Sequence, residues 1–186
     1  THEHLVRITE AFAGLMRRFE ANVRRDRRLM AELGISPRLF PLLEADSADA
    51  LAFSRADFFL SPDGRWVLSE FNEDVPGGFN EAVGLPALLS ASELGGEPVG
   101  DLRGSLCAAF AGCDAVGMVF ATAFSEDLQH CSMLARWLRD SGHRTVHASP
   151  EQLRMHWSGP RLAGVLVHGV FRFYPGEWFG LLPNLA

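Results

Sequence analysis

The stretch 55-RADFFLSPDGRWVLSEFNEDVPGG-78 decides how the first half of the chain is expected to fold. Two runs rich in aromatic and aliphatic residues flank a Pro-Asp-Gly sequence, a pattern that predicts a β-hairpin with a tight turn. We therefore expect strands over 54–61 and 65–72. Polar side chains gather at the strand ends farthest from the turn, and these are Arg55, Asp57, Glu70 and Asn72.

The turn sequence permits two registers, which place the two acids differently. A three-residue loop over 62–64, built as a type I turn with a glycine bulge, pairs Ser61 with Arg65. In that register the side chains of Asp57 and Glu70 lie on opposite faces of the hairpin.

The alternative is a loop of two or four residues, which pairs Ser61 with Trp66. It sets the two acids directly across from each other, and likewise Arg55 and Asn72. A four-residue loop suits Pro62 better, because proline cannot donate a hydrogen bond to the strand ladder. We expect this register, in which one face of the hairpin is a core face formed by Ala56, Phe58, Leu60, Val67 and Phe71 and interrupted by Ser69.

Directly opposed carboxylates repel each other, so this register requires a compensating cation. Arg55 can supply that charge, and so can a metal ion. Two carboxylates and an amide oxygen form a set of hard oxygen ligands that suits Mg²⁺. The residues therefore support a metal site formed by Asp57, Glu70 and Asn72, with a structural salt-bridge cluster on a solvated hairpin as the alternative.

A pair of glycines follows the second strand. Gly77 and Gly78 give their backbone N–H groups the freedom to approach an anion closely. We therefore expect these two residues to contribute to substrate binding.

Helical patterns precede and follow the hairpin. Apolar residues recur at helical spacing over 3–32, which predicts one long helix. A short helical segment is expected over 37–44, and a further helix over 79–91. The polar, glycine-rich stretch 92–104 is interpreted as a loop, and 105–112 as a short helix.

The pattern changes in the second half of the chain. The continuous apolar run 114–122 predicts a buried parallel strand. A helix is expected to open with the capping sequence Ser125-Glu126-Asp127 and to run to about Asp140. A second strand over 144–149 and a short helix from Pro150 follow. Strand–helix–strand order implies a βαβ unit with a right-handed crossover.

The fold class that these patterns predict is α/β. Residues 157–174 add a further pair of strands that turn near Ser158-Gly159-Pro160. The order is then a long N-terminal helix, a layer of hairpin and helix, and a Rossmann-like βαβ unit. Ligands bind at the carboxyl edge of such a sheet, so the segment 125–127 is a candidate ligand site, with simple helix capping as the alternative.

Composition excludes several classes of protein. The net charge of −6 argues against a general role in binding nucleic acid or anionic membranes. No apolar run reaches the roughly 18 residues of a membrane span and no signal peptide opens the chain, so we expect a cytoplasmic protein. All 17 basic residues are arginine, which excludes a P-loop lysine or a Schiff base within this chain. The three cysteines lack C-x-x-C spacing and are expected to be buried free thiols.

Two motifs resemble those of glutathionylspermidine synthase-like proteins, which are ATP-grasp ligases that form C–N bonds. The first motif consists of 55-RAD-57 and 70-EFNEDVP-76, separated by the turn. The second is 171-FRFYPGEWFG-180, which resembles a Tyr-Pro-x-Glu-Trp element of that family. The helix and the Rossmann-like layer between them come in the order that the resemblance implies. The related circularly permuted ATP-grasp proteins share a similar first motif.

The resemblance implies an activity and a role for each motif residue. ATP phosphorylates a substrate carboxylate, and an amine then attacks the acyl phosphate to form an amide. Asp57, Glu70 and Asn72 match the Mg²⁺ positions of the family. Arg55 matches a catalytic arginine that contacts the phosphoryl group or the acid substrate. Glu177, in the second motif, is expected to face the substrate cleft. The alternative for this motif is that Trp178 and Tyr174 anchor the domain junction.

The same resemblance implies a division of the chain. Residues 1–104 correspond to the helix and motif hairpin of the synthetase core, and 105–174 to a Rossmann-like pre-ATP-grasp unit. Residues 175–186 then begin a connection to a nucleotide-binding half that is missing from this sequence. We expect the fragment to be inactive unless a C-terminal half or a partner chain supplies the ATP-contacting lysines. The expected ligands are Mg²⁺, ATP, a small-molecule acid and a small-molecule amine.

Two alternatives remain open. One is a non-catalytic small-molecule-binding or scaffold domain derived from the same fold. The other is a Rossmann-type binding module centred on 114–149. Its largest pocket would lie at the edge of those strands, away from Asp57 and Glu70.

Overall fold

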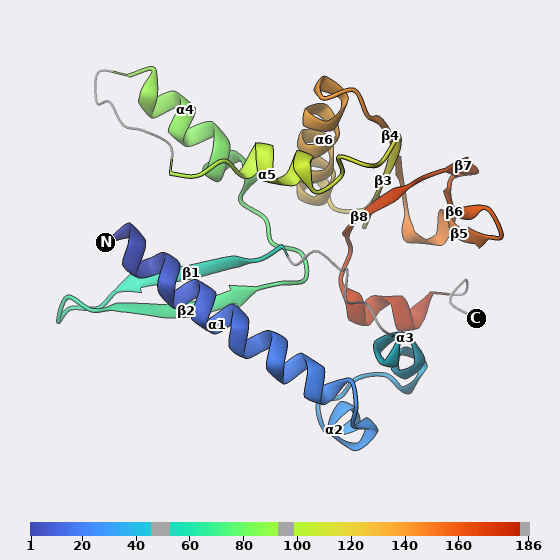
Figure 1. Cartoon of the computed structure of the whole chain (residues 1–186), viewed down its shortest axis with the longest axis horizontal. Coiled ribbons are helices and arrows are strands. Elements are labelled where there is room, and N and C mark those ends of the chain that lie inside the picture. The colour runs from blue at the N-terminus through green and yellow to red at the C-terminus, as the bar shows by residue number, and fades with distance from the viewer. Residues whose placement is uncertain (46–52, 93–98, 183–186) are drawn as a thin grey trace. The chain divides into compact units, whose positions relative to one another are not determined.

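The computed structural model describes residues 1–45, 53–92 and 99–182, and it divides the chain into two compact units (Figure 1). The first unit consists of Thr1–Glu73 together with Gly176–Leu181, and the second of Asp74–Pro175 together with Leu182. The division between these units falls at Glu73. The predicted α/β class is confirmed, since both helices and strands occur in each unit.

The N-terminal helical region contains two helices rather than the single one predicted over 3–32. Helix α1 spans His2–Val23 and α2 spans Arg27–Glu32. The break follows from Asp26, whose carboxylate accepts hydrogen bonds of 2.9 and 3.2 Å from two backbone N–H groups in the first turn of α2. A side chain that caps a new helix in this way competes with continuation of the old one.

A short helical segment follows α2, as predicted for 37–44. It consists of η1 (Pro37–Leu39) and α3 (Phe40–Glu44). A small hydrophobic cluster of Val23, Met30 and Phe40 joins the three helices. Arg24 fixes the end of α3, because its guanidinium donates to two backbone carbonyl oxygens there, those of Leu43 and Ala45, at 2.6 and 2.8 Å.

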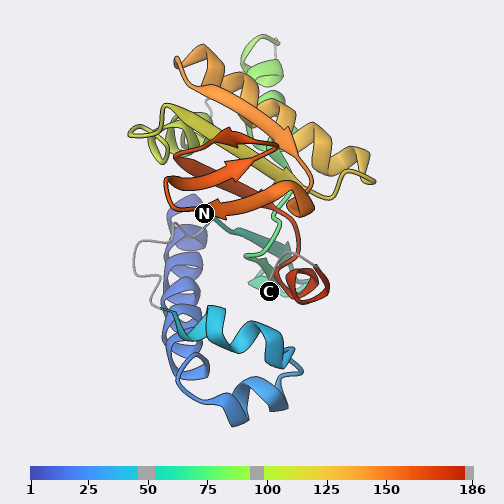
Figure 2. The same ribbon diagram turned by 90° about the vertical axis from the view of Figure 1, so that its right-hand side faces the viewer.

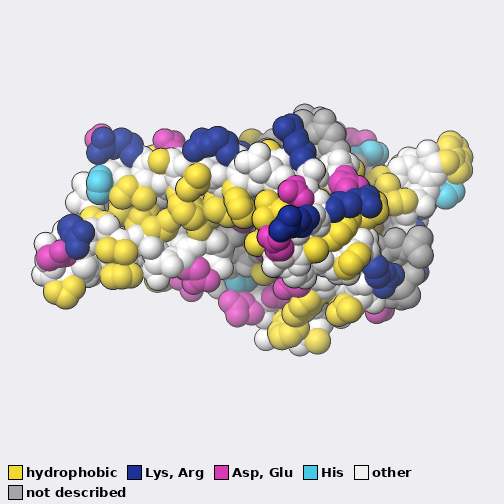
Figure 3. All heavy atoms as spheres, turned by 90° about the horizontal axis from the view of Figure 1, so that it is seen from below, with side chains coloured by type: hydrophobic (Ala, Val, Ile, Leu, Met, Phe, Trp, Pro, Cys, Tyr) yellow, Lys and Arg dark blue, Asp and Glu magenta, His cyan; other side chains and the backbone are white. Residues whose placement is uncertain are grey.

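The predicted hairpin is confirmed as strands β1 (Arg55–Leu60) and β2 (Trp66–Asn72). Helix α1 packs on it, with the rings of Phe12 and Phe71 meeting edge to face at 5.1 Å. Part of the apolar surface of α1 itself stays uncovered. Leu15 and Phe19 remain 51% and 45% exposed, and hydrophobic side chains are widespread on the face drawn in Figure 3.

The second unit is built on a three-stranded parallel sheet with the order β4-β3-β8. The strands are β3 (Ala115–Phe120), β4 (Arg144–Ala148) and β8 (Gly169–Phe173). All six residues of β3 are buried, which is the environment that a continuous apolar run predicts. Helix α6 (Ser125–Asp140) connects β3 to β4, so the predicted βαβ unit is confirmed.

The two faces of this sheet are covered differently (Figures 1 and 2). Helix α6 lies over one face, where Phe171 and Phe173 of β8 pack with Phe79 at ring-centroid distances of 6.3 and 6.2 Å. On the other face, Val119 packs with Leu162 and two other buried residues, Ala148 and Val167.

The prediction of a simple strand pair over 157–174 is wrong. Strands β5 (Leu153–His156), β6 (Gly159–Leu162) and β7 (Val165–Leu166) form a separate antiparallel sheet, and β8 pairs in parallel with β3 instead. Tight turns explain the difference. Gly159, Ala163 and Gly164 adopt φ values of 114°, 48° and 81°, which let the chain reverse twice within a few residues.

The remaining helices differ from the prediction mainly at their ends. The helix expected over 79–91 is a π-helical segment, η2 (Asn80–Gly84), followed by α4 (Leu85–Ser90). Helix α5 spans Leu102–Ala108 and therefore begins before the predicted 105. It does so because Asp101 caps it and accepts a 2.8 Å hydrogen bond from a backbone N–H. Part of the predicted connector, 93–98, lies outside the described residues.

Cys107, Cys113 and Cys131 form no disulfide, as predicted, but only Cys131 is buried and the other two are half-buried. Burial raises the pKa of Cys131 to about 12. This thiol therefore stays protonated at neutral pH and packs as a small apolar side chain.

Gly117 on the central strand tests the packing of the second unit. A Cβ atom at this position would lie 3.0 Å from a methyl carbon of Leu162 and 3.5 Å from one of Val167. We expect Gly117→Val to lower the free energy of unfolding by about 1–3 kcal/mol through overpacking. Urea denaturation followed by circular dichroism measures the change.

The matched control is Gly112→Val, because a Cβ atom at Gly112 would meet nothing within 4 Å. Equal urea midpoints for the two variants would show that the small sheet does not pack on β3 as described.

Candidate functional site

The hairpin brings together the four polar residues that the sequence singled out. The strand ladder pairs Asp57 with Glu70, and Arg55 with Asn72. The structure confirms the predicted pairing of these residues. The four-residue loop that was predicted to produce it is not present, however. Ser61 N–H donates a 2.9 Å hydrogen bond to the carbonyl oxygen of Arg65, so the turn is the three-residue loop.

A β-bulge reconciles the three-residue loop with the opposed acids. Near the turn the ladder pairs Leu60 with Trp66 and Phe58 with Leu68, whereas the next pair is Asp57 with Glu70. One residue of β2, Ser69, is therefore extra. Such a bulge shifts the register by one residue and returns both acids to the same face.

The bulge also changes the predicted core face. Residues opposite Phe58 and Leu60 share their face, so Leu68 and Trp66 join the side that carries Ala56 and Phe71. Val67, which was predicted to lie on that side, pairs with Phe59 on the other. The physical reason is that the loop length, not the placement of Pro62, sets the register near the turn.

Arg55 holds Asp57 through two parallel hydrogen bonds. Its Nε and NH2 groups donate to Oδ1 and Oδ2 of Asp57 at 2.7 and 2.9 Å. The hydrogen bonds from Arg55 lower the pKa of Asp57, against an opposing effect of burial. Both side chains are partly exposed, at 43% and 35%, so solvent screens the attraction between them.

Asn72 links this pair to Glu70. In the amide orientation that satisfies the surrounding groups, Asn72 donates to Glu70 Oε1 at 3.0 Å and accepts from Arg55 NH2 at 3.1 Å. The four side chains therefore form one connected cluster that contains two carboxylates and a single guanidinium.

The positive charge that compensates the opposed carboxylates comes from within the cluster. Arg55 supplies that charge, since it binds both carboxylate oxygens of Asp57. The oxygens of Glu70 and Asn72 suit a hard cation, but Asp57 could join them only if Arg55 released it. Over 1–45, 53–92 and 99–182, no three His, Cys, Asp or Glu side chains group in a way that would hold a metal ion.

The other predicted site residues lie elsewhere in the structure. Gly77 and Gly78 belong to the second unit, where Gly78 N–H donates a 2.9 Å hydrogen bond to His130 Nε2. That N–H is therefore occupied and not free to meet an anion. Glu177 lies exposed in the segment η4 (Gly176–Leu181), which Arg38 anchors through a 2.6 Å hydrogen bond to the carbonyl oxygen of Gly180.

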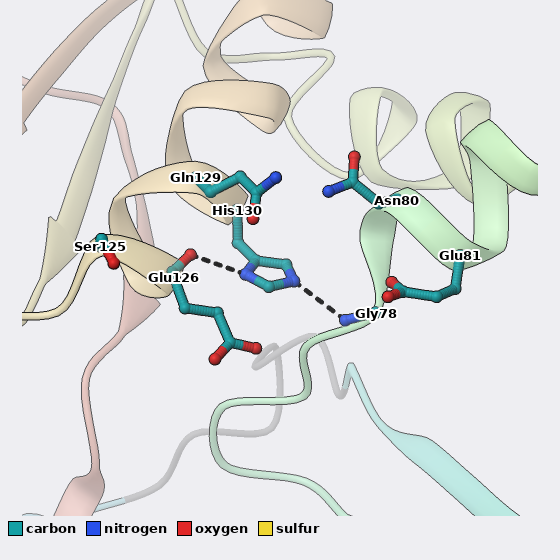
Figure 4. Close-up of a pocket in the computed structure, with 7 residues that line it drawn as sticks. All are labelled: Gly78, Asn80, Glu81, Ser125, Glu126, Gln129 and His130. Atoms are coloured by element: carbon teal, nitrogen blue, oxygen red, sulfur yellow. Dashed lines mark hydrogen bonds between the residues drawn. The ribbon is translucent and has the colours of Figure 1, made fainter.

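The second unit contains a pocket of about 520 Å³ (Figure 4). It lies beyond the carboxyl end of β3, where α6 begins, and the segment that leads into η2 forms its opposite wall. The sequence pointed to this edge through Ser125 and Glu126. The lining residues are Gly78, Asn80, Glu81, Ser125, Glu126, Gln129 and His130.

Ser125 does not serve as the N-cap of helix α6. Phe124 occupies the cap position of α6, and it makes no side-chain capping bond. The helix opens at Ser125 as predicted, but Ser125 is not its N-cap residue. Ser125 is instead the first residue of the helix and lines the pocket.

His130 is one of the pocket residues that the sequence analysis did not single out. It is 4% exposed, and its ring stacks on Phe173 at 5.2 Å and meets the edge of Phe79 at 4.8 Å. Its Nδ1 lies 2.8 Å from the carbonyl oxygen of Glu126, while Nε2 accepts from Gly78 N–H. These partners select the neutral Nδ1–H tautomer. The available signal was its i+4 spacing from Glu126.

Comparison with known proteins does not assign the chain to a family. No protein-family model matches the sequence, and no curated protein sequence matches it at a significant level. In the part of the chain that the structure describes, no helix has the length and apolarity needed to cross a membrane.

The lowered pKa of Asp57 gives a direct test of the cluster. Because the folded-state pKa is depressed, this pairing stabilises the fold above the unfolded pKa of about 3.9 and the effect is lost as pH falls through the folded pKa. We expect Arg55→Gln to raise the pKa of Asp57 toward its ordinary range. Carboxyl ¹³C chemical shifts measured against pH report the change.

Asp63 is the internal control for this titration. Its pKa is lowered by Ser61 and then by Arg65, neither of which belongs to the cluster. A shift of both carboxyl groups, or of neither, in Arg55→Gln would contradict the described pairing.

Proposed function

We propose that this chain contributes the cation- and acid-binding part of an ATP-dependent ligase that joins a carboxylate to an amine. The observation that carries the proposal is the cluster of Arg55, Asp57, Glu70 and Asn72 on one face of the hairpin. The same four residues carry the resemblance to glutathionylspermidine synthase-like ATP-grasp ligases.

The chemistry of the cluster supports this proposal. Phosphoryl transfer is catalysed mainly by positioning and by neutralising charge that moves between oxygen atoms. Asp57, Glu70 and Asn72 would hold Mg²⁺, which neutralises phosphate charge when bound. Arg55 would hold the transferred phosphoryl group or the acid substrate, since a guanidinium binds planar oxyanions through two hydrogen bonds.

The contact between Arg55 and Asp57 gives this proposal a specific consequence. Arg55 competes with a divalent cation for the carboxylate of Asp57. Release of Arg55 toward an anionic substrate would free that carboxylate, so binding of the two ligands would be coupled. Coupling of this kind requires that each ligand change the affinity for the other by the same factor.

Binding of Mn²⁺, measured by electron paramagnetic resonance, tests the cation site. We expect Asp57→Asn and Glu70→Gln each to weaken Mn²⁺ binding by about thirtyfold, because one charge acting on a divalent ion at about 4 Å in water contributes about 2 kcal/mol. Arg55→Gln should strengthen Mn²⁺ binding, because it removes the competing guanidinium.

Glu32→Gln is the control, since Glu32 is an exposed acid that pairs with Arg28 on α2. Equal Mn²⁺ affinity in the wild type and all cluster variants would exclude the metal assignment.

Release of ADP tests the ligase activity itself. The protein expressed from its intact gene is incubated with ATP, Mg²⁺ and panels of small acids and amines. We expect release only when an acid and an amine are both present, and a loss of at least about tenfold in Asp57→Asn and Glu70→Gln. Turnover in these two variants at the wild-type rate would remove the hairpin from the reaction.

A second candidate function is small-molecule binding by the second unit alone. The pocket at the carboxyl end of β3 favours it, because open parallel sheets bind ligands at that edge. Ligand binding that Asp57→Asn and Glu70→Gln leave unchanged would support this function. Loss of such binding in both variants would contradict it.

A further inference from the structure

The pocket beside α6 has the size and composition of a ligand site. Its volume of about 520 Å³ falls in the range of small-molecule pockets. Its wall carries side-chain amides from Asn80 and Gln129, a hydroxyl from Ser125, and carboxylates from Glu81 and Glu126. Figure 4 shows both carboxylates extending from opposite walls, Glu81 from the η2 side and Glu126 from α6.

The charged side chains that line this pocket are both acidic. No arginine lines the pocket, and within the described residues no ion pair involves Glu81 or Glu126. A third acid, Asp127, follows Glu126 in α6. Burial, and after it the charge of Glu126, raises the pKa of Asp127.

His130 does not supply the missing positive charge. Its Nε2 accepts from Gly78 N–H and its Nδ1–H donates to the carbonyl oxygen of Glu126, so both ring nitrogens are used in the neutral form. A second proton would place an N–H directly against that of Gly78. The ring therefore forms a neutral wall.

Gly77 lies beside the carboxylate of Glu126 and the ring of His130. A Cβ atom at Gly77 would lie 3.6 Å from Glu126 Oε1 and 3.3 Å from the His130 ring. The absence of a side chain at Gly77 thus leaves room for the carboxylate. A carboxylate at this point repels anions, so the pocket is unsuited to phosphate or to an acid substrate.

We propose that this pocket binds a small organic cation, a molecule with a protonated amine or a guanidinium group. The two carboxylates would pair with the cationic group, and the amides and hydroxyl would accept or donate further hydrogen bonds. The proposal does not depend on ATP or on the hairpin cluster. It adds a second site, in a different unit of the chain, with the opposite charge preference to the one predicted for Gly77 and Gly78.

A series of four-carbon probes tests the charge preference at constant size. Butylammonium, butylguanidinium, 1-butanol and butyrate are titrated into the ¹⁵N-labelled protein, without ATP or divalent cation. We expect one or both cations to shift the amide signals of Gly78 and Glu126, whereas butanol and butyrate should not. Which cation binds more tightly identifies the head group that the pocket prefers.

Two variants locate the effect. Glu81→Gln and Glu126→Gln should each weaken cation binding by about fivefold, as loss of one nearby charge predicts. Glu151→Gln is the matched control, because Glu151 is an exposed acid of the same unit that does not line the pocket. Unchanged signal dispersion in each spectrum confirms that the variants remain folded.

Three results would overturn the proposal. These are no response to either cation at 10 mM or so, an equal response to butyrate or butanol, and cation binding that neither glutamate variant weakens. None of them bears on Mn²⁺ binding by the hairpin, so failure here and failure of the ligase proposal are distinguishable.

Discussion

The extra residue in strand β2 is the constraint on which the hairpin cluster depends. Without a bulge at Ser69, the three-residue turn would place Asp57 and Glu70 on opposite faces of the hairpin. With it, two carboxylates, an amide and a guanidinium share one face, and Arg55 can bind Asp57 while Asn72 reaches Glu70. Bulges that redirect side chains in this way are frequent next to functional sites. The proposed cation chemistry therefore depends on one backbone irregularity.

The second unit relies on a different kind of constraint, a neutral imidazole buried among aromatic rings. His130 is held between Phe173 and Phe79, and its two nitrogens join α6 to the segment at Gly78. This link forms one wall of the pocket and uses the N–H that might otherwise meet an anion. What remains exposed to the pocket is acidic and amide in character, which is why a cation is the ligand that the site favours.

Much of the fold could be predicted from the sequence because its signals are local. The apolar run that became β3 and the helix that follows it needed only burial and periodicity. The break before α2 was missed because Asp26 interrupts an otherwise helical pattern with a cap, which periodicity does not register. The opposed acids were predicted for the wrong reason. The three-residue turn and the bulge at Ser69 shift the strand register in opposite senses, and the sequence pattern reveals neither feature separately. His130 and Glu81 were missed because the pocket joins segments that are distant in the chain.

Cross-strand backbone NOEs in the hairpin report directly on the bulge at Ser69. We expect contacts between Phe58 and Leu68 and between Asp57 and Glu70, with Ser69 left without a partner. A regular ladder, in which Asp57 faces Ser69 and Ala56 faces Glu70, would contradict this pairing. The two acids would then lie on opposite faces, and no single cation could contact both.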